Sequence, residues 1–194
     1  DEAPANVSPE NPGTENTTGR ISYRNRDVAG SEVQADAYFG DQRLVFPLFP
    51  GFPPQSGNDS QKFGARTTID TPLDRVISGA RVTWGADYLQ DRTAQYVSDG
   101  RTFAPPIDQQ SLGPFARIKL PVGDRLTLRG GSRHEAIWLQ VDDFTTIEEM
   151  GGNAVEGGDL SYSATVFDAG AVLHVTDQLD LAVATLPASN IAAK

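Results

Sequence analysis

The sequence predicts an all-β protein, an antiparallel up-and-down β-meander or barrel of about eight strands with long loops at one end. Three observations predict this fold class. Polar and apolar residues alternate along most of the 194 residues, which is the period of two that a strand with two different faces shows. No segment shows the 3.6-residue period of an amphipathic helix. Short turns alternate with long connections, so the long ones gather at one end of the sheet.

Eight segments show the strand pattern, with bounds at about 20–28, 31–46, 61–71, 75–97, 111–120, 125–143, 159–175 and 178–187. The last two form a hairpin around the turn VTDQ. Before the first strand, DEAPANVSPENPGTENTTG holds three prolines, four acidic residues and a single large apolar residue, Val7. Because such a composition buries too little surface to offset its ordering entropy, residues 1–18 are expected to be a disordered acidic leader. Residues 19–194 are expected to form the β-barrel domain.

The connections between the strands alternate in length. VAGS, TPLD, PVGD and VTDQ are short, whereas residues 47–59, 98–110 and 144–158 form long loops. Short turns at one end and long loops at the other are typical of transmembrane barrels. The strands on either side of the 98–110 loop exceed the roughly 10 residues that cross a bilayer, so they are expected to project beyond it.

Alternation sorts the residues of each strand onto two faces. Val82, Trp84 and Tyr88 share one side of their strand, and Phe39 and Ile118 belong to similar apolar sides. Two arrangements remain open: a soluble barrel or sandwich with an apolar core, or a membrane barrel with an apolar outside and a polar lumen. In the second arrangement, charges that pair in the lumen are expected to include Arg81, Asp87, Arg129, Arg133 and Glu135.

Composition excludes several classes of function. The net charge of −10, from 16 basic and 26 acidic residues, has the wrong sign for binding nucleic acid. The chain has no cysteine, and its two histidines, His134 and His174, lack the spacing of metal ligands. No Ser-His-Asp arrangement, P-loop or G-x-G-x-x-G motif after a strand is present, so we expect neither catalysis nor a metal or other cofactor. No run of about 18 apolar residues predicts a transmembrane helix.

Two stretches carry a resemblance to a known family. They are LGPFARIKLPVGDRLTLRGGSRHEAIWLQVDDFTTI at residues 112–147 and VEGGDLSYSATVFDAGAVLHVTDQLDLAVA at residues 155–184. A Pro-Phe-Ala strand start, a short turn, a Leu-Thr-Leu-x-Gly-Gly-x-Arg strand, a long loop and a Tyr-x-Ala-Thr-x-Phe strand follow one another. In this order the chain resembles the β-barrel of TonB-dependent outer-membrane siderophore receptors. RTTIDTPLD and VTWGADYLQDRT, within residues 66–93, fit the preceding strand pair, so the resemblance covers about residues 60–186.

The resemblance implies a segment of an outer-membrane barrel, with lipid around it and a ferric siderophore as its ligand. The plug domain and TonB box of the family have no counterpart in the sequence, so the chain alone is not expected to be competent for gated transport. Aromatic and cationic side chains on long loops would suit an anionic, catecholate-like ferric chelate. By this analogy the ligand-binding candidates are Phe46, Phe49 and Phe52 at the 47–59 loop, and Arg101 and Phe103 in the 98–110 loop.

The residues alone leave a second function open. A soluble or secreted β-barrel or sandwich with its apolar side chains inward would be a binding or assembly module, either a remnant or an engineered derivative of such a barrel. An exposed apolar face would also permit self-association. The two functions differ in one simple property, namely whether the protein stays soluble and monodisperse without detergent.

Overall fold

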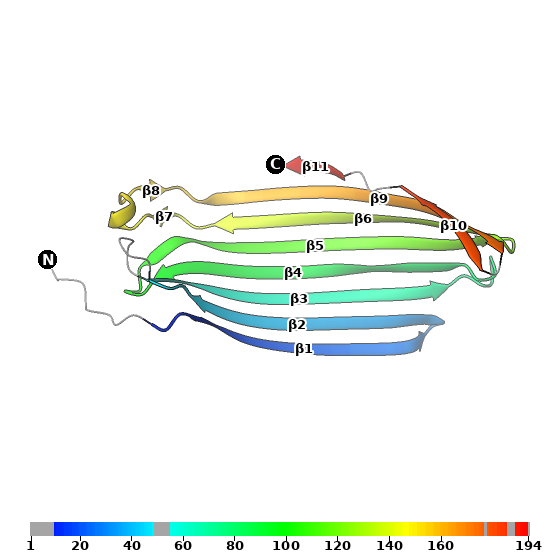
Figure 1. Cartoon of the computed structure of the whole chain (residues 1–194), viewed down its shortest axis with the longest axis horizontal. Helices are drawn as coiled ribbons and strands as arrows, with labels where there is room; N and C mark the ends of the chain where they lie inside the picture. The colour runs from blue at the N-terminus through cyan, green and yellow to red at the C-terminus, as the bar shows by residue number, and fades with distance from the viewer. Residues whose placement is uncertain (1–9, 49–54, 177, 186–188, 194) are drawn as a thin grey trace.

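The chain forms one long antiparallel sheet in which each strand pairs with its neighbours in the sequence (Figure 1). The computed structural model describes residues 10–48, 55–176, 178–185 and 189–193. The strands are β1 (Gly13–Val28), β2 (Ser31–Val45), β3 (Ser56–Pro72), β4 (Arg81–Val97), β5 (Thr102–Val122), β6 (Leu126–Val141), β9 (Gly158–Thr176) and β10 (Leu179–Ala184). Their order is β1-β2-β3-β4-β5-β6-β9-β10, so the predicted fold class and up-and-down order are confirmed.

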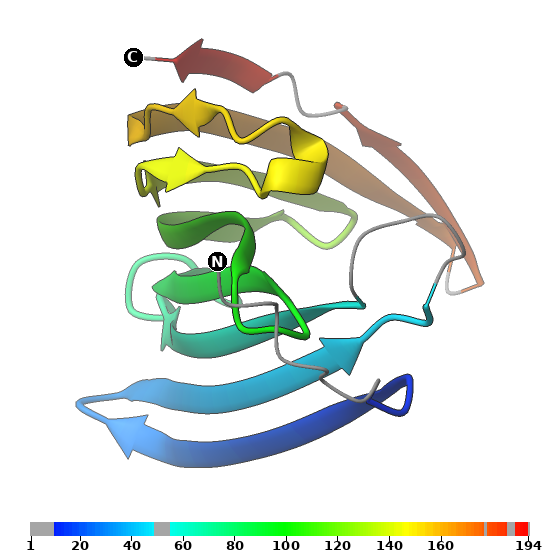
Figure 2. The ribbon, with the colours of Figure 1, turned by 90° about the vertical axis from the view of Figure 1, so that its left-hand side faces the viewer.

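Smaller elements complete the sheet and one loop. β11 (Ser189–Ala193) pairs with the Tyr162–Val166 part of β9, beyond the part of β9 that pairs with β10. Between β6 and β9, β7 (Phe144–Thr145) and β8 (Ala154–Val155) flank a single 3-10 turn, η1 (Glu148–Met150). Seen along the strands, the sheet is curved but does not close into a barrel (Figure 2). No helix among the described residues is long and apolar enough to cross a membrane.

Three strands begin earlier than the sequence predicts. β3 starts at Ser56 and not near residue 61, so the end of the expected 47–59 loop is strand. β1 starts at Gly13, so residues 13–18 of the expected leader pair with β2, whereas residues 1–9 lie outside the described part of the chain. These polar residues join the sheet because a strand ladder requires only backbone N–H and C=O groups. β5 starts at Thr102, so most of the expected 98–110 loop is strand and the β4–β5 connection is a four-residue turn. Pro105 and Pro106 suggested a loop, but the β4–β5 register shifts near Gln95 and accommodates them.

One strand begins later than predicted. The 75–97 strand starts only at Arg81, because residues 73–80 form a turn. Leu73 N–H donates to Ala80 O at 2.8 Å, and Gly79 adopts a φ of +73° with its N–H bonded to Asp74 Oδ1. Val76 therefore lies in this turn and not on a strand face. The predicted alternation of short and long connections is consequently wrong in detail, since this turn has eight residues and residues 98–101 only four.

The sheet has almost no hydrophobic core. Among the apolar residues that the structure describes, only Ala80, Val97 and Ile147 are buried, and Ala80 and Ile147 lie in connections and Val97 at a strand end. In contrast, Trp84, Phe39 and Phe167 are exposed at 47%, 47% and 65%. A sheet whose apolar side chains are this exposed needs a second layer or an apolar environment to cover them.

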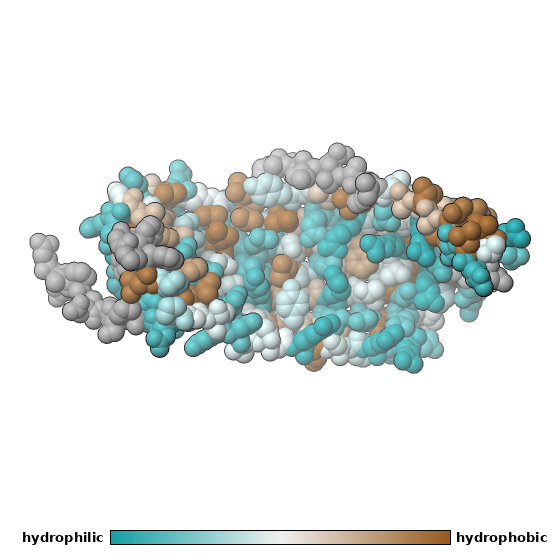
Figure 3. Space-filling view, in the orientation of Figure 1, coloured by the Kyte–Doolittle hydropathy of each residue, from teal (hydrophilic) through white to brown (hydrophobic). Residues whose placement is uncertain are grey.

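The strand register confirms that apolar and charged residues occupy opposite faces. Trp84 lies directly opposite Ile69 and Ala116. We call the side of Trp84 the apolar face; it carries Ile21, Tyr23, Val33, Phe39, Phe63, Ile69, Val82, Tyr88, Leu112, Ile118, Leu128, Trp138 and Phe167. We call the other side the charged face; it carries Arg20, Asp36, Arg66, Asp70, Arg81, Asp87, Arg117, Lys119, Arg129, Arg133, Glu135 and Asp168. Figure 3 shows hydrophilic side chains over the middle of the sheet and hydrophobic ones gathered near β10.

Candidate functional site

An ion-pair network on the charged face connects three strands. Asp87 on β4 accepts hydrogen bonds from Arg66 on β3 and, at 2.6 Å, from Nη1 of Arg133 on β6. Arg133 also pairs with Glu135, with 2.6 Å between its Nη2 and the carboxylate Oε2. One carboxylate thus holds two guanidinium groups, and one of these is held by a second carboxylate. The charges of the network balance internally, with two cations and two anions.

Gly113 makes the longest of these contacts possible. Arg133 and Asp87 lie on β6 and β4, so the arginine must cross β5 to reach its partner. It passes over Gly113, where an added Cβ would lie 2.2 Å from Arg133 Nη2 and 2.6 Å from Glu135 Oε2. The absence of a side chain at this position therefore leaves the space for the cross-strand ion pair.

A second group of polar side chains lies next to the network, on β1 and β2. Asp36 accepts hydrogen bonds from Arg20 at 2.8 Å and from Ser22 at 2.5 Å, and Arg24 pairs with Glu32 at 2.6 Å. Arg20 and Asp36 of this group line one hollow of about 690 Å³ together with the residues of the network. Its wall combines these ion-paired side chains with Tyr38, Ala65, Tyr88 and Leu89. Among the described residues, no group of three or more His, Asp or Glu side chains is placed to hold a metal ion.

The predicted lumen charges all lie on the charged face, but the structure does not bring all of them together. Asp87, Arg133 and Glu135 meet in the network. Arg81 pairs instead with Asp70, at 3.0 Å between Nη1 and Oδ1. Arg129 forms no ion pair with any carboxylate that the structure describes.

The apolar face ends abruptly toward the loop end of the strands. Phe39, Phe63 and Trp138 occupy one row that crosses the sheet through the strand register, and Tyr88 lies 6.3 Å from Phe63 between ring centroids. The next row on the same face is entirely polar: Thr17, Asp41, Gln61, Arg92, Asp108 and Gln140. A row with aromatic residues on β2, β3 and β6, and with Gln90 and Gln110 between them on β4 and β5, thus marks a boundary between an apolar and a polar zone.

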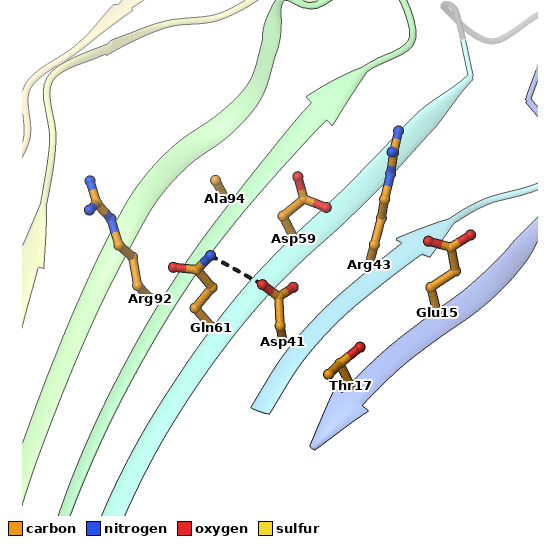
Figure 4. Close-up of a pocket in the computed structure, with 8 residues that line it drawn as sticks. All are labelled: Glu15, Thr17, Asp41, Arg43, Asp59, Gln61, Arg92 and Ala94. Atoms are coloured by element: carbon orange, nitrogen blue, oxygen red, sulfur yellow. Dashed lines mark hydrogen bonds between the residues drawn. The ribbon is translucent and has the colours of Figure 1, made fainter. Parts of the chain in front are cut away.

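Beyond this boundary the same face is hollowed and charged (Figure 4). The hollow, of about 470 Å³, is lined by Glu15, Thr17, Asp41, Arg43, Asp59, Gln61, Arg92 and Ala94. Gln61 donates to Asp41 at 3.3 Å, and Arg43 donates to the Tyr96 hydroxyl at 2.9 Å. Sequence reasoning missed this zone. The sequence does contain a signal for it. Asp41, Gln61 and Arg92 fall on the side of their strands that carries apolar residues nearer the turns, so the alternation changes from apolar to polar there.

The structure places the predicted ligand-binding residues at the loop end as far as it describes them. Phe46 follows β2 directly, Phe103 belongs to β5 and not to a loop, and Arg101 lies in the β4–β5 turn. Phe49 and Phe52 lie outside the described residues. Arg101 pairs with Asp99 at 2.7 Å and with Glu149 of η1 at 3.0 Å, so it links two loops.

Comparison with known proteins assigns the chain to a family. Residues 3–185 match the family model described as "TonB dependent receptor-like, beta-barrel". The chain belongs to this family. The strand order and the separate apolar and charged faces of this segment of a TonB-dependent receptor barrel are thus features of a family member, and the resemblance drawn from residues 60–186 is confirmed.

Two curated relatives are siderophore receptors by name. The chain is 25% identical over 207 residues to the rhizobactin receptor of Rhizobium meliloti (strain 1021) and 24% identical over 203 residues to the ferric aerobactin receptor of Klebsiella pneumoniae. Each match covers 86% of this chain and 27% of the relative, so the chain spans about a quarter of the length of these receptors. No solved structure matches the chain.

The loop link of this TonB-dependent receptor barrel is expected to depend on pH. Hydrogen bonds from Arg101 lower the pKa values of Asp99 and Glu149 below their ordinary values of 3.8 and 4.5. Because both values are depressed, the stabilisation is fully present above pH 4.5 and is lost as the pH falls through the lowered values. We expect amide hydrogen exchange around η1 to be slow at pH 7 and to accelerate, after correction for intrinsic rates, below about pH 4.

Arg101→Gln provides the matched control for this pH effect. The variant should exchange quickly around η1 already at pH 7 and should show no further pH-dependent loss of protection. Equal protection of the variant and the original chain at pH 7 would show that the ion pairs do not hold the loop.

Proposed function

We propose that the chain forms part of the wall of an outer-membrane ferric-siderophore receptor. In this proposal the apolar face contacts lipid, the charged face lines the lumen, and the loop end of the strands contacts the siderophore. The observation that carries the proposal is the placing of Phe39, Phe63 and Trp138 in one row at the edge of the apolar zone, with only polar residues in the next row. Aromatic girdles of this kind mark the membrane–water interface of transmembrane barrels.

The lengths of the strands support the same orientation. β3 to β5 have 17 to 21 residues, whereas roughly 10 residues suffice to cross a bilayer. The polar zone beyond the aromatic row then corresponds to the part of the strands that projects into water. The alternative of a soluble module would require the apolar face to be covered, and only three apolar residues in the described part of the chain are buried.

The proposed ligand rests on the two relatives and on the residues at the loop end. Both relatives are named as receptors, and one of them for ferric aerobactin, which supports a binding function and not a catalytic one. Phe46 and Phe103 offer aromatic surface at this end, and we extend the proposal to Phe49 and Phe52. Arg101 contributes by fixing η1 to the β4–β5 turn, because its charge is already balanced by two carboxylates.

The test is binding of ferric aerobactin to the whole chain in detergent micelles or bilayer nanodiscs. We expect saturable binding that the Phe46→Ala/Phe103→Ala double variant weakens about tenfold, which corresponds to the loss of about 1.4 kcal/mol of contact energy. Arg75→Ala, in the turn at the opposite end of the strands, is the matched control and should leave the affinity unchanged. An equal loss in both variants, or no saturable binding, would contradict the proposed ligand contacts.

A further inference from the structure

Three cations stand side by side on the charged face near its turn end. In the strand register, Lys119 on β5 lies directly opposite Arg81 on β4 and directly opposite Arg129 on β6. All three side chains are exposed. Like charges directly opposite one another on a sheet are destabilising. Repulsion between the three cations therefore lowers the stability of the sheet unless an anion binds over them.

Most other cations of the charged face have a carboxylate partner. Arg66 and Arg133 share Asp87, Arg20 pairs with Asp36, and Lys62 pairs with Asp91 at 3.2 Å. In the row of three, only Arg81 has a carboxylate partner among the described residues, namely Asp70. One row toward the loops, Arg117 also lacks an ion pair within the described part of the chain.

The surroundings of this row are open. Gly170 of β9 follows Arg129 in the same row, so no side chain stands at that position. In the next row an added Cβ at Gly131 would lie 2.6 Å from Asp168 Oδ1 and 2.8 Å from Arg117 Cγ, so the Asp168 carboxylate lies beside Arg117 and leaves the row of three uncovered. Arg117 also borders a hollow of about 370 Å³ that Asp168 and Phe115 help to line. A ligand can therefore lie against several of these cations at once.

We propose that Arg81, Lys119 and Arg129, with Arg117 beside them, bind a small polycarboxylate. Neighbouring strands lie about 4.8 Å apart, so the row spreads its charges over roughly 10 Å. Two or three carboxylates spaced along one small molecule match this spread better than a single compact phosphate does. Guanidinium groups also suit carboxylates, because their two parallel N–H donors fit the two oxygens. This site goes beyond the proposed function, since it lies at the opposite end of the strands from the loop residues.

The test compares citrate with inorganic phosphate by calorimetric titration of the whole chain in detergent. We expect citrate to bind more tightly than phosphate, and the Lys119→Gln/Arg129→Gln double variant to weaken citrate binding at least about tenfold. Lys62→Gln is the matched control, because it removes a cation from the same face that already has a carboxylate partner. Equal citrate affinity in the double variant and the original chain would overturn the proposal, and phosphate binding as tight as citrate would overturn the ligand class.

A second readout does not depend on any ligand. If the row is an unfilled anion site, the double variant removes repulsion and should be at least as stable as the original chain toward urea without citrate. A clear loss of stability would mean that these cations already have partners within the chain, and the proposal would fail. Ferric aerobactin binding at the loop end should persist in this variant, so that failure of this site and failure of the proposed function are distinguishable.

Discussion

Trp84→Arg is expected to block insertion of the chain into lipid bilayers. Trp84 lies on the apolar face, six residues along β4 from Gln90 in the row of Phe63 and Trp138, and is 47% exposed in the isolated sheet. An arginine on the lipid face of a transmembrane barrel costs about 2–4 kcal/mol near the bilayer midplane. Insertion can be measured as the fraction of chain that becomes protected from added protease in liposomes.

Thr68→Arg is the matched control for this prediction. Thr68 neighbours Ile69, which lies directly opposite Trp84, but its side chain belongs to the charged face and borders the hollows there. An arginine at this position enters the polar side of the same strand level and should permit insertion. If both variants insert equally, the apolar face does not contact lipid.

The fluorescence of the two tryptophans can also measure how deep each of them lies in the bilayer. Trp84 and Trp138 are the only tryptophans of the chain, and both lie on the apolar face. In single-tryptophan variants, lipids brominated deep in the acyl chains should quench Trp84 more, and lipids brominated near the headgroup should quench Trp138 more. If Trp84 is shielded in detergent-free buffer in a monomeric chain, the membrane assignment is wrong and a soluble module remains.

Gly113→Leu is expected to lower the free energy of unfolding by about 1–3 kcal/mol, the range found when a packed position is overfilled. The new side chain would occupy the space through which Arg133 reaches Asp87. Arg133 can move aside because its end is flexible, but it then loses the carboxylate across β5. Urea titration of the chain in detergent measures the effect.

A double-mutant cycle with Arg133→Met separates this loss from a general effect on β5. When Arg133 no longer crosses Gly113, the leucine should cost much less, so the two changes should be strongly non-additive. Gly130→Ala is the control on β6, because its added Cβ meets nothing closer than 3.7 Å. Additive costs for Gly113→Leu and Arg133→Met would show that the cross-strand ion pair does not depend on Gly113.

The strands and their faces could be predicted because alternation is a local property of the chain. On the turn side of the Phe39–Trp138 row, the apolar sides of β2, β4, β5 and β6 follow the sequence pattern. Strand ends were harder, because polar residues at 13–18 and the Pro105–Pro106 pair resemble loops although their backbones join the ladder. The ion-pair partners could not be predicted, because Arg133 meets Asp87 through the register of three strands and the space at Gly113.

The contacts of the loop residues could not be predicted from the sequence either. Arg101 stays a predicted ligand contact, but its pairing with Glu149, 48 positions further along the chain, could not be predicted. Such a contact depends on the way two connections fold over each other at the end of the sheet. Neither alternation nor composition contains that information, so the role of a loop charge can be judged only from its partners in space.

The strict nearest-neighbour order of the sheet has a consequence for the spread of mutational effects. A side chain on β2 contacts β1 and β3 but has no packed core through which to influence β6. Changes on well-separated strands, such as Phe39→Ala on β2 and Leu128→Ala on β6, should therefore add in their free energies. Changes linked by a bridge over an intervening strand, as between Asp87 and Arg133, are the exceptions. The strands of this sheet can therefore accept substitutions independently of one another. Coupled substitutions are expected only where a side chain crosses an intervening strand to reach its partner.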